Sequence, residues 1–298
     1  MKNSKNTVKV EPKPDLVAQE IRPGQSIELL KELHILTREG KLNQDSRRKL
    51  KQVYHLYGFI EKLLLEFPTT DKGLTLADHG AGKSYLGFII YDLFFNALEN
   101  KTKRLSHADD HIYGIETRAE LVQKSRELAA RLGFKGMSFL NLSVAESAQS
   151  ADLPPQIDIV TALHACDTAT DDAIAFGLQK RAKYMVLVPC CQAEVAAHLR
   201  NNRGLAVAKT PLAELWRHPL HTRELGSQIT NVLRCLYLEA SGYQVTVTEL
   251  VGWEHSMKNE LILAKYTGTQ KLSAANHLRE VLTQFGLEEL LKTRFKLV

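Results

Sequence analysis

The feature that most constrains the fold is a regular alternation of strand-like and helix-like segments from Gly73 onward. Short apolar runs typical of strands lie at residues 74–78, 111–116, 137–143, 157–165 and 182–190. Helical spacing of apolar residues lies between them at residues 83–99, 119–133 and 171–180, with Gly133 as an expected C-cap. This alternation predicts an α/β fold in which helices cover both faces of a largely parallel sheet.

The end of the sequence departs from this alternation. Residues 243–251 and 259–266 are strand-like, and the loop between them is too short for a parallel crossover, so they predict an antiparallel hairpin. A final helical segment follows. We therefore divide the chain into a flexible tail (1–24), an N-terminal helical segment (25–70), a main domain (71–268) and a C-terminal helix (269–298).

The composition indicates a cytoplasmic protein of ordinary globular type. Hydrophobic residues make up 44% and charged residues 24%, and no apolar run approaches the ~18 residues of a membrane span. The first 20 residues contain no apolar segment that could act as a signal peptide. The four cysteines suit a reducing compartment, and the net charge of +5 weakly favours an anionic partner. The sequence does not indicate an oligomeric state.

The turn after the first predicted strand, residues 78–84, has two interpretations. Gly82-Lys83-Ser84 resembles the end of a phosphate-binding P-loop, but that motif requires glycine at position 77, where this sequence has Ala77. The Asp78-x-Gly80-x-Gly82 pattern is instead typical of a nucleotide-binding βα turn, whose glycines let the backbone approach a ligand closely. We favour the second interpretation and expect these three residues to bind S-adenosylmethionine (SAM).

Polar residues at the ends of the other predicted strands extend this hypothesis. Glu116 ends the second strand, where a carboxylate can accept hydrogen bonds from both ribose hydroxyls. Asn141 or Ser143 follows the third strand and could reach the adenine edge. His164 follows the fourth strand, and we expect it to lie near the cofactor, although a hydrogen-bonded core histidine is the alternative. Asp171 fits a helix start after that strand.

Several blocks together resemble a known family. The blocks are DHGAGKSYLGFIIYDLF, LHACDTATDDAI, VPCCQ, ITNVLRCLYLEASGYQVTV and WEHSMKNELILA. Across residues 45–268 they resemble the class I SAM-dependent methyltransferase domain of the methyltransferase-like group, which includes glutathione S-transferase C-terminal-domain-containing proteins. More distantly, the chain is similar to tRNA 2′-O-methyltransferases, which carry glycine at the position of Asp167 and have extra zinc-binding segments that this sequence lacks.

The resemblance implies a fold, a cofactor and a reaction. It implies a Rossmann-like sheet of seven strands whose last strand is antiparallel, to which the helical patterns of the sequence add helices at both ends of the chain. It implies SAM as the cofactor and methyl transfer as the activity. The more distant similarity, together with the positive charge, favours RNA as the acceptor, either tRNA or rRNA. A protein or small-molecule acceptor, a SAM- or RNA-binding protein without catalysis, and an NTPase are the alternatives.

Candidate bases lie near the same predicted edge of the sheet. Methyl transfer from a sulfonium depends mostly on alignment of the acceptor with the methyl group. A hydroxyl acceptor also needs a general base, whereas an amine or ring nitrogen needs mainly a neutral lone pair. His164, Asp167 and His255 are the candidate bases.

Other candidates could shape the acceptor pocket. Cys190 and Cys191 could line it, act as a nucleophile, pack as small hydrophobes, or bind zinc together with the preceding His-x-Cys motif; the unusual spacing makes us expect no metal. Lys258 and Asn259 could orient an anionic or polar acceptor, and a polar hairpin loop is the alternative. The cations at residues 47–51 either begin a solvated helix, which base rates favour, or form a basic face for RNA.

Overall fold

The computed structural model shows an α/β domain with helical additions. It describes residues 20–68, 72–96, 109–163, 165, 167–189, 192–201, 209–250 and 260–297. No helix within these ranges is long and apolar enough to cross a membrane.

One sheet of seven strands forms the centre of the molecule, in the order β3-β2-β1-β4-β5-β7-β6. The strands are β1 (Thr75–His79), β2 (His111–Ile115), β3 (Met137–Leu140), β4 (Ile159–Leu163), β5 (Tyr184–Val188), β6 (Tyr243–Glu249) and β7 (Glu260–Tyr266). Strands β1 to β5 are parallel, and β7 runs antiparallel to both β5 and β6. The predicted sheet and its antiparallel hairpin are confirmed.

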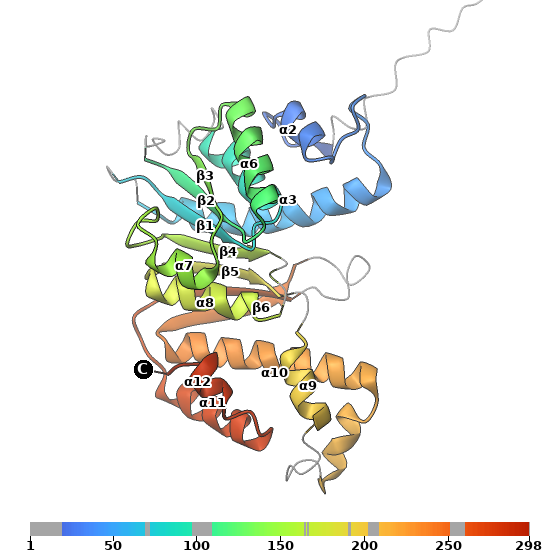
Figure 1. Ribbon diagram of the computed structural model, residues 1–298, viewed down its shortest axis with the longest axis vertical. Helices are drawn as coiled ribbons and strands as arrows, with labels where there is room; N and C mark the ends of the chain where they lie inside the picture. Colours follow the sequence, from blue (N-terminus) through green and yellow to red (C-terminus); the bar gives the residue numbers. More distant parts are fainter. Residues whose placement is uncertain are drawn as a thin grey trace, which may run out of the picture.

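Helices cover both faces of the sheet (Figure 1). One face packs against α2 (Ile27–Glu32), α3 (Gln44–Leu65), α4 (Tyr85–Ile90), the π-helix η1 (Tyr91–Phe95) and α6 (Ala119–Leu132). The other face packs against α7 (Val144–Gln149), α8 (Ala169–Gln179), α9 (Glu194–Asn201), α10 (Pro219–Ala240), α11 (Leu272–Gln284) and α12 (Leu290–Thr293). Each face has its own apolar core, so the domain has three layers.

Local sequence explains several helix ends. Helix α6 ends at Gly133, which has φ 69°, as its position in the sequence predicts. The helix predicted over residues 83–99 begins only at Tyr85, because Ser84 before it has a left-handed φ of 52°. The single helix predicted at the C-terminus is in fact two helices, α11 and α12, and Gly286 between them has φ 65°.

The segment between β5 and β6 contains helices that have no counterpart among the sequence predictions. They are α9, the short 3₁₀ helix η3 (Pro211–Trp216) and the 22-residue α10. Helix α10 packs against α9 and α11 and buries Leu233 and Leu238 in the core of its face. This long helix therefore connects the C-terminal additions to the sheet.

Candidate active site

The turn after β1 lies at the carboxyl ends of the parallel strands and is open to solvent. Gly80 has φ 62° and Gly82 has φ 57°, so both occupy the left-handed region that favours glycine. A Cβ at either position would meet its nearest neighbour only at 3.7 Å, so the backbone conformation, rather than a lack of space, requires glycine here. Gly80 and Lys83 are exposed, which leaves the turn accessible to a ligand.

Ser84, which takes the place of a third glycine, is accommodated by glycines elsewhere. Its side chain is fully buried, and its Oγ has no hydrogen-bond partner among the described residues. A Cβ on Gly87 would lie 2.7 Å from this Oγ, and a Cβ on Gly114 would lie 3.5 Å from it. Gly87 therefore leaves the room that Ser84 fills, and Ser84 is a packing residue of the turn.

Asp78 is buried directly before the glycine turn. It is 3% exposed, and the Thr161 hydroxyl on β4 donates a 2.7 Å hydrogen bond to its Oδ1. Burial raises the pKa of Asp78 to about 7, although the hydrogen bond from Thr161 acts in the opposite direction. The carboxyl group therefore exchanges its proton near neutral pH.

His79, the next residue, belongs to the core. Burial lowers its pKa to about 3, so the imidazole is neutral at physiological pH. Its ring meets Phe176 in an edge-on contact with centroids 4.4 Å apart, and its Nε2 has no hydrogen-bond partner within the described part of the chain. The neutral ring thus closes the base of the turn.

Glu116 joins the end of β2 to the glycine turn. The Gly82 N–H donates a 2.8 Å hydrogen bond to Oε2, and the Arg118 backbone N–H donates a 3.0 Å bond to Oε1. Burial raises the pKa of Glu116, but the hydrogen bonds from Arg118 and Gly82 outweigh it and lower the pKa to about 2. The site therefore contains a permanently ionised carboxylate beside the open turn, which fits a ligand with hydroxyl donors.

Arg118 is a site residue that the sequence predictions missed. Its Nε and Nη2 donate hydrogen bonds of 3.0 Å to the two oxygens of Glu116, although its side chain is 62% exposed. The guanidinium thus covers the carboxylate at which the ribose is predicted to bind. An arginine two residues after a strand-end glutamate is the signal that could have indicated this pair.

Asn141 and Ser143 both have local structural roles after β3. The Asn141 amide donates hydrogen bonds to the carbonyl oxygens of Glu116 (3.1 Å) and Thr117 (2.8 Å), which ties the ends of β2 and β3 together. Ser143 forms a capping box with Glu146 at the start of α7. Their proposed contact with adenine stays a prediction.

Asp167 links the end of β4 to the segment after β5. Its backbone is left-handed, with φ 50°, and its Oδ1 accepts hydrogen bonds from the N–H groups of Ala193 (3.0 Å) and Glu194 (3.5 Å). Among the described residues, the hydrogen bonds that this carboxylate accepts all go to Oδ1. The carboxylate therefore positions the start of α9 as well as lying at the edge of the sheet.

A buried arginine holds this region together, and the sequence predictions missed it. Arg234 on α10 is 0% exposed, and its Nε and Nη2 donate hydrogen bonds of 2.6 and 2.9 Å to the carboxylate of Asp171. Its Nη2 also donates to the Asp167 carbonyl at 2.8 Å. Asp171 therefore lies in the first turn of α8 as an ion-pair partner, and the N-cap is Thr168.

Asn231, one turn before Arg234, extends the network to β5 and β7. Its Oδ1 accepts hydrogen bonds from Arg234 Nη1 and Gln192 Nε2, both at 3.1 Å. Its Nδ2 donates a 2.7 Å bond to Glu260 at the start of β7. The arginine among the apolar residues of α10 could have predicted this network from the sequence, because a buried charge requires a buried partner. Helix α10 thus fixes three strand ends at the edge that carries the glycine turn.

The remaining predicted site residues lie outside the described residues. They are His164, Cys190, Cys191, His255, Lys258 and Asn259, together with Cys166. Their described neighbours place the ends of β4 and β5 and the start of β7 along one edge.

The fold and this edge define the class of protein. A seven-stranded sheet with β7 antiparallel between β5 and β6, and with a glycine turn and an acidic residue after its first two strands, is that of a class I SAM-dependent methyltransferase. The sequence matches the family described as "Methyltransferase domain" over residues 48–198, about half of the chain, and the chain belongs to this family. Its cofactor is SAM, and the P-loop interpretation of Gly82-Lys83-Ser84 is not supported.

Solved structures with a related arrangement include three methyltransferases. Magnesium protoporphyrin IX methyltransferase from Synechocystis PCC 6803 is 11% identical, with a TM-score of 0.43 over 80% of this chain and 94% of that chain. The CMeT domain of citrinin polyketide synthase is 13% identical, with a TM-score of 0.44 over 77% of this chain and 58% of that chain. A SAM-dependent methyltransferase from Aquifex aeolicus is 17% identical, with a TM-score of 0.37 over 75% of this chain and 97% of that chain. No curated protein matches the sequence.

Proposed function

We propose that this methyltransferase acts on RNA, with tRNA or rRNA as the acceptor. The observation that carries the proposal is the position of the basic start of α3 beside the glycine turn. Lys49 Nζ lies 3.4 Å from the centroid of the Tyr85 ring, and Tyr85 is the first residue of α4, directly after the turn. Cations on α3 therefore border the edge that carries the glycine turn, where we propose that methyl transfer takes place.

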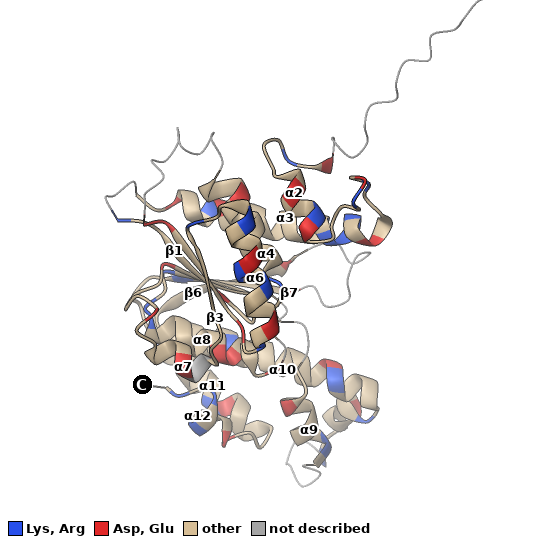
Figure 2. Cartoon of the chain, turned by 45° about the horizontal axis from the view of Figure 1, so that its top comes forward, with Lys and Arg blue, Asp and Glu red and all other residues tan. Residues whose placement is uncertain are grey.

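The charges on this border are available to a polyanion. Arg48, Lys49, Lys51 and Lys83 are exposed, and Figure 2 shows the charged segments of α3. Arg48 makes only a 3.8 Å ion pair with an exposed Asp45, whereas Arg47 is held by Glu20 through its Nε. Phosphate groups attract such exposed cations, and the net charge of +5 acts in the same direction.

The proposed cofactor contacts use the strand ends described above. SAM, when bound, supplies a methyl group on a sulfonium. Glu116 accepts hydrogen bonds from the ribose hydroxyls, Gly80 and Gly82 let the backbone approach the ligand, and Asn141 or Ser143 reaches the adenine edge. Asp78, directly before the turn, and His164, after β4, complete the proposed cofactor contacts.

The proposed acceptor side uses residues after β4, β5 and β6. His164, Asp167 or His255 takes the proton from a hydroxyl acceptor, Cys190 and Cys191 line the pocket, and Lys258 and Asn259 orient the acceptor. Asp167 fits a base in one respect, since among the described residues the backbone N–H groups that bind its carboxylate both donate to Oδ1. These roles make alignment of the acceptor the main contribution of the chain.

Replacing Glu116 with alanine is expected to weaken binding of S-adenosylhomocysteine (SAH) by about thirtyfold, because charged hydrogen bonds to the ribose are lost. The loss is not larger because Arg118 already occupies the carboxylate in the free protein. Calorimetric titration measures the effect. Glu120→Ala, which removes an exposed carboxylate from the first turn of α6, is the matched control and should bind SAH as the wild type does.

Replacing Arg118 with glutamine is expected to strengthen SAH binding by up to about fivefold, because the ribose no longer has to displace an exposed salt bridge. The same titration measures it. Weaker binding in this variant would mean that Arg118 contacts the cofactor rather than competing with it.

Replacing Lys49 and Lys51 with alanine is expected to raise KM for RNA. Affinity for RNA falls as salt concentration rises, and the magnitude of the slope of log affinity against log salt should decrease by about 1.4, at roughly 0.7 per lost phosphate contact with single-stranded RNA. SAH affinity should not change. Lys292→Ala/Lys296→Ala removes two exposed cations near the C-terminus and is the control. An unchanged salt slope in the α3 variant would show that these lysines of α3 do not contact RNA phosphates.

The acceptor itself is tested with radiolabelled SAM. RNA, protein and small-molecule fractions from cells that lack this enzyme are incubated with the purified protein. We expect the label in RNA. Label that enters protein or small molecules but never RNA would overturn the proposed acceptor while leaving the methyltransferase activity established.

A further inference from the structure

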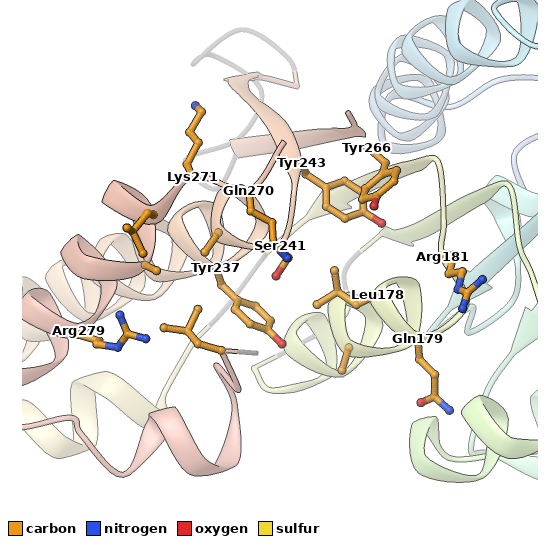
Figure 3. A pocket seen from close by; sticks show the side chains of 15 residues that line it. Leu178, Gln179, Arg181, Tyr237, Ser241, Tyr243, Tyr266, Gln270, Lys271 and Arg279 are labelled. Carbon is orange, nitrogen blue, oxygen red and sulfur yellow. The ribbon is translucent and has the colours of Figure 1, made fainter. Parts of the chain in front are cut away.

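A cavity lies at the edge of the sheet opposite the glycine turn. It has a volume of about 680 Å³ and is bordered by the ends of α8 and α10, the start of β6, the end of β7 and the start of α11 (Figure 3). The strand register fixes its place, because Tyr243 at the start of β6 pairs with Tyr266 at the end of β7. The cavity therefore belongs to the amino ends of the parallel strands and is separate from the cofactor site.

The charged residues that line this cavity, among those the structure describes, are cations. Arg181, Lys271 and Arg279 line it, and no aspartate or glutamate is among the described residues that do. Lys271 is paired with Glu239 at 2.6 Å, whereas Arg279 donates, among the described residues, to the neutral amide of Asn276. Arg181 makes no ion pair within the described part of the chain. Two guanidinium groups thus remain available for an anion.

Tyrosine rings form part of the wall. The Tyr243 hydroxyl donates a 2.7 Å hydrogen bond to the Ala182 carbonyl, and the Tyr237 hydroxyl donates to the Lys296 carbonyl at 3.3 Å, so both rings are fixed. Tyr266 is 52% exposed, and its ring meets Tyr243 at an angle of 61° with centroids 5.1 Å apart. Tyr266 therefore offers a supported ring surface on which a planar group can stack.

We propose that this cavity binds a nucleoside phosphate, either a free nucleotide or a nucleotide of a single-stranded RNA. The phosphate pairs with Arg181 or Arg279, and the base stacks on Tyr266. Ser241 and Gln270, which also line the cavity, supply hydrogen-bonding groups for the ribose or the base edge. Cations, an exposed aromatic ring and neutral polar groups in one cavity match the three parts of a nucleotide. The inference is independent of the proposed acceptor.

The test uses the full chain saturated with SAH, so that AMP cannot bind at the cofactor site. AMP and a fluorescent oligoadenylate are titrated into the wild type, Tyr266→Leu and the double variant Arg181→Asn/Arg279→Gln. Asparagine is chosen at position 181 because Arg181 has φ 53°, which asparagine tolerates. We expect affinity to fall by about tenfold in each variant, from lost stacking and lost charged hydrogen bonds respectively.

Arg131→Gln, an exposed arginine on α6, is the matched control and should bind as the wild type does. AMP binding without oligoadenylate binding assigns the cavity to a free nucleotide. Tighter binding of the oligomer, competed by AMP, assigns it to RNA. Failure of both ligands to bind, equal affinity in all variants, or equal competition by polyglutamate would overturn the proposal, whatever the methyl acceptor is.

Discussion

Replacing Arg234 with methionine is expected to lower the free energy of unfolding by about 3–5 kcal/mol, the usual cost of leaving one member of a buried ion pair without its partner. Arg234 is fully buried, and the Asp171 carboxylate that it binds is 7% exposed. Without the guanidinium, Asp171 and the Asp167 carbonyl both lose hydrogen-bond donors. Urea unfolding at neutral pH, followed by circular dichroism, measures the change.

The double variant Arg234→Met/Asp171→Leu separates an unpaired charge from lost packing. It removes both charges, so most of the stability should return. A double variant as unstable as the single one would show that the unpaired carboxylate is not the cause. Since Arg234 also holds the Asp167 carbonyl, we expect the restored protein to bind SAH normally while transferring methyl groups more slowly.

Replacing Asp78 with asparagine is expected to change how stability depends on pH. The pKa of Asp78 is about 7 in the folded chain, against the ordinary value of 3.8. Because the folded pKa is raised, the stability that this group contributes is fully present below about pH 4 and is lost as the pH rises to about 7. A difference of about three pKa units corresponds to about 4 kcal/mol.

Asparagine stays neutral and can still accept the hydrogen bond from Thr161. Relative to the wild type, the variant should therefore gain about 4 kcal/mol between pH 4 and pH 8. Urea unfolding of both proteins at the two pH values measures this gain. Parallel pH profiles would mean that the pKa of Asp78 is the same in the folded and unfolded chains.

Local patterns were enough to predict most of the sheet. The five parallel strands, the closing hairpin and the end of α6 at Gly133 each follow from a few adjacent residues. The helices between β5 and β6, including the long α10, were not predicted, because the prediction in this region relied on strand-like runs. The π-helical turn at residues 91–95 and the break at Gly286 depend on packing that spacing alone does not show.

The predicted site residues were chosen by their position at strand ends, and their contacts could not be predicted in the same way. The bond between Gly82 and Glu116 joins residues 34 apart, and the bonds between Arg234 and Asp171 join residues 63 apart. The Ser84 side chain fits where it is buried because Gly87 leaves space beside it. Such contacts arise from tertiary packing. The position of a residue at a strand end therefore predicts which edge of the sheet carries the site, but not which hydrogen bonds form there.

Calorimetric titration of the purified wild-type protein with SAH, run beside ATP with magnesium, tests the central claim most directly. We expect SAH to bind and ATP not to bind, with SAH affinity about thirtyfold lower in Glu116→Ala than in the wild type. Binding of ATP alone, or SAH affinity that does not change in Glu116→Ala, would contradict a SAM site at the carboxyl ends of β1 and β2.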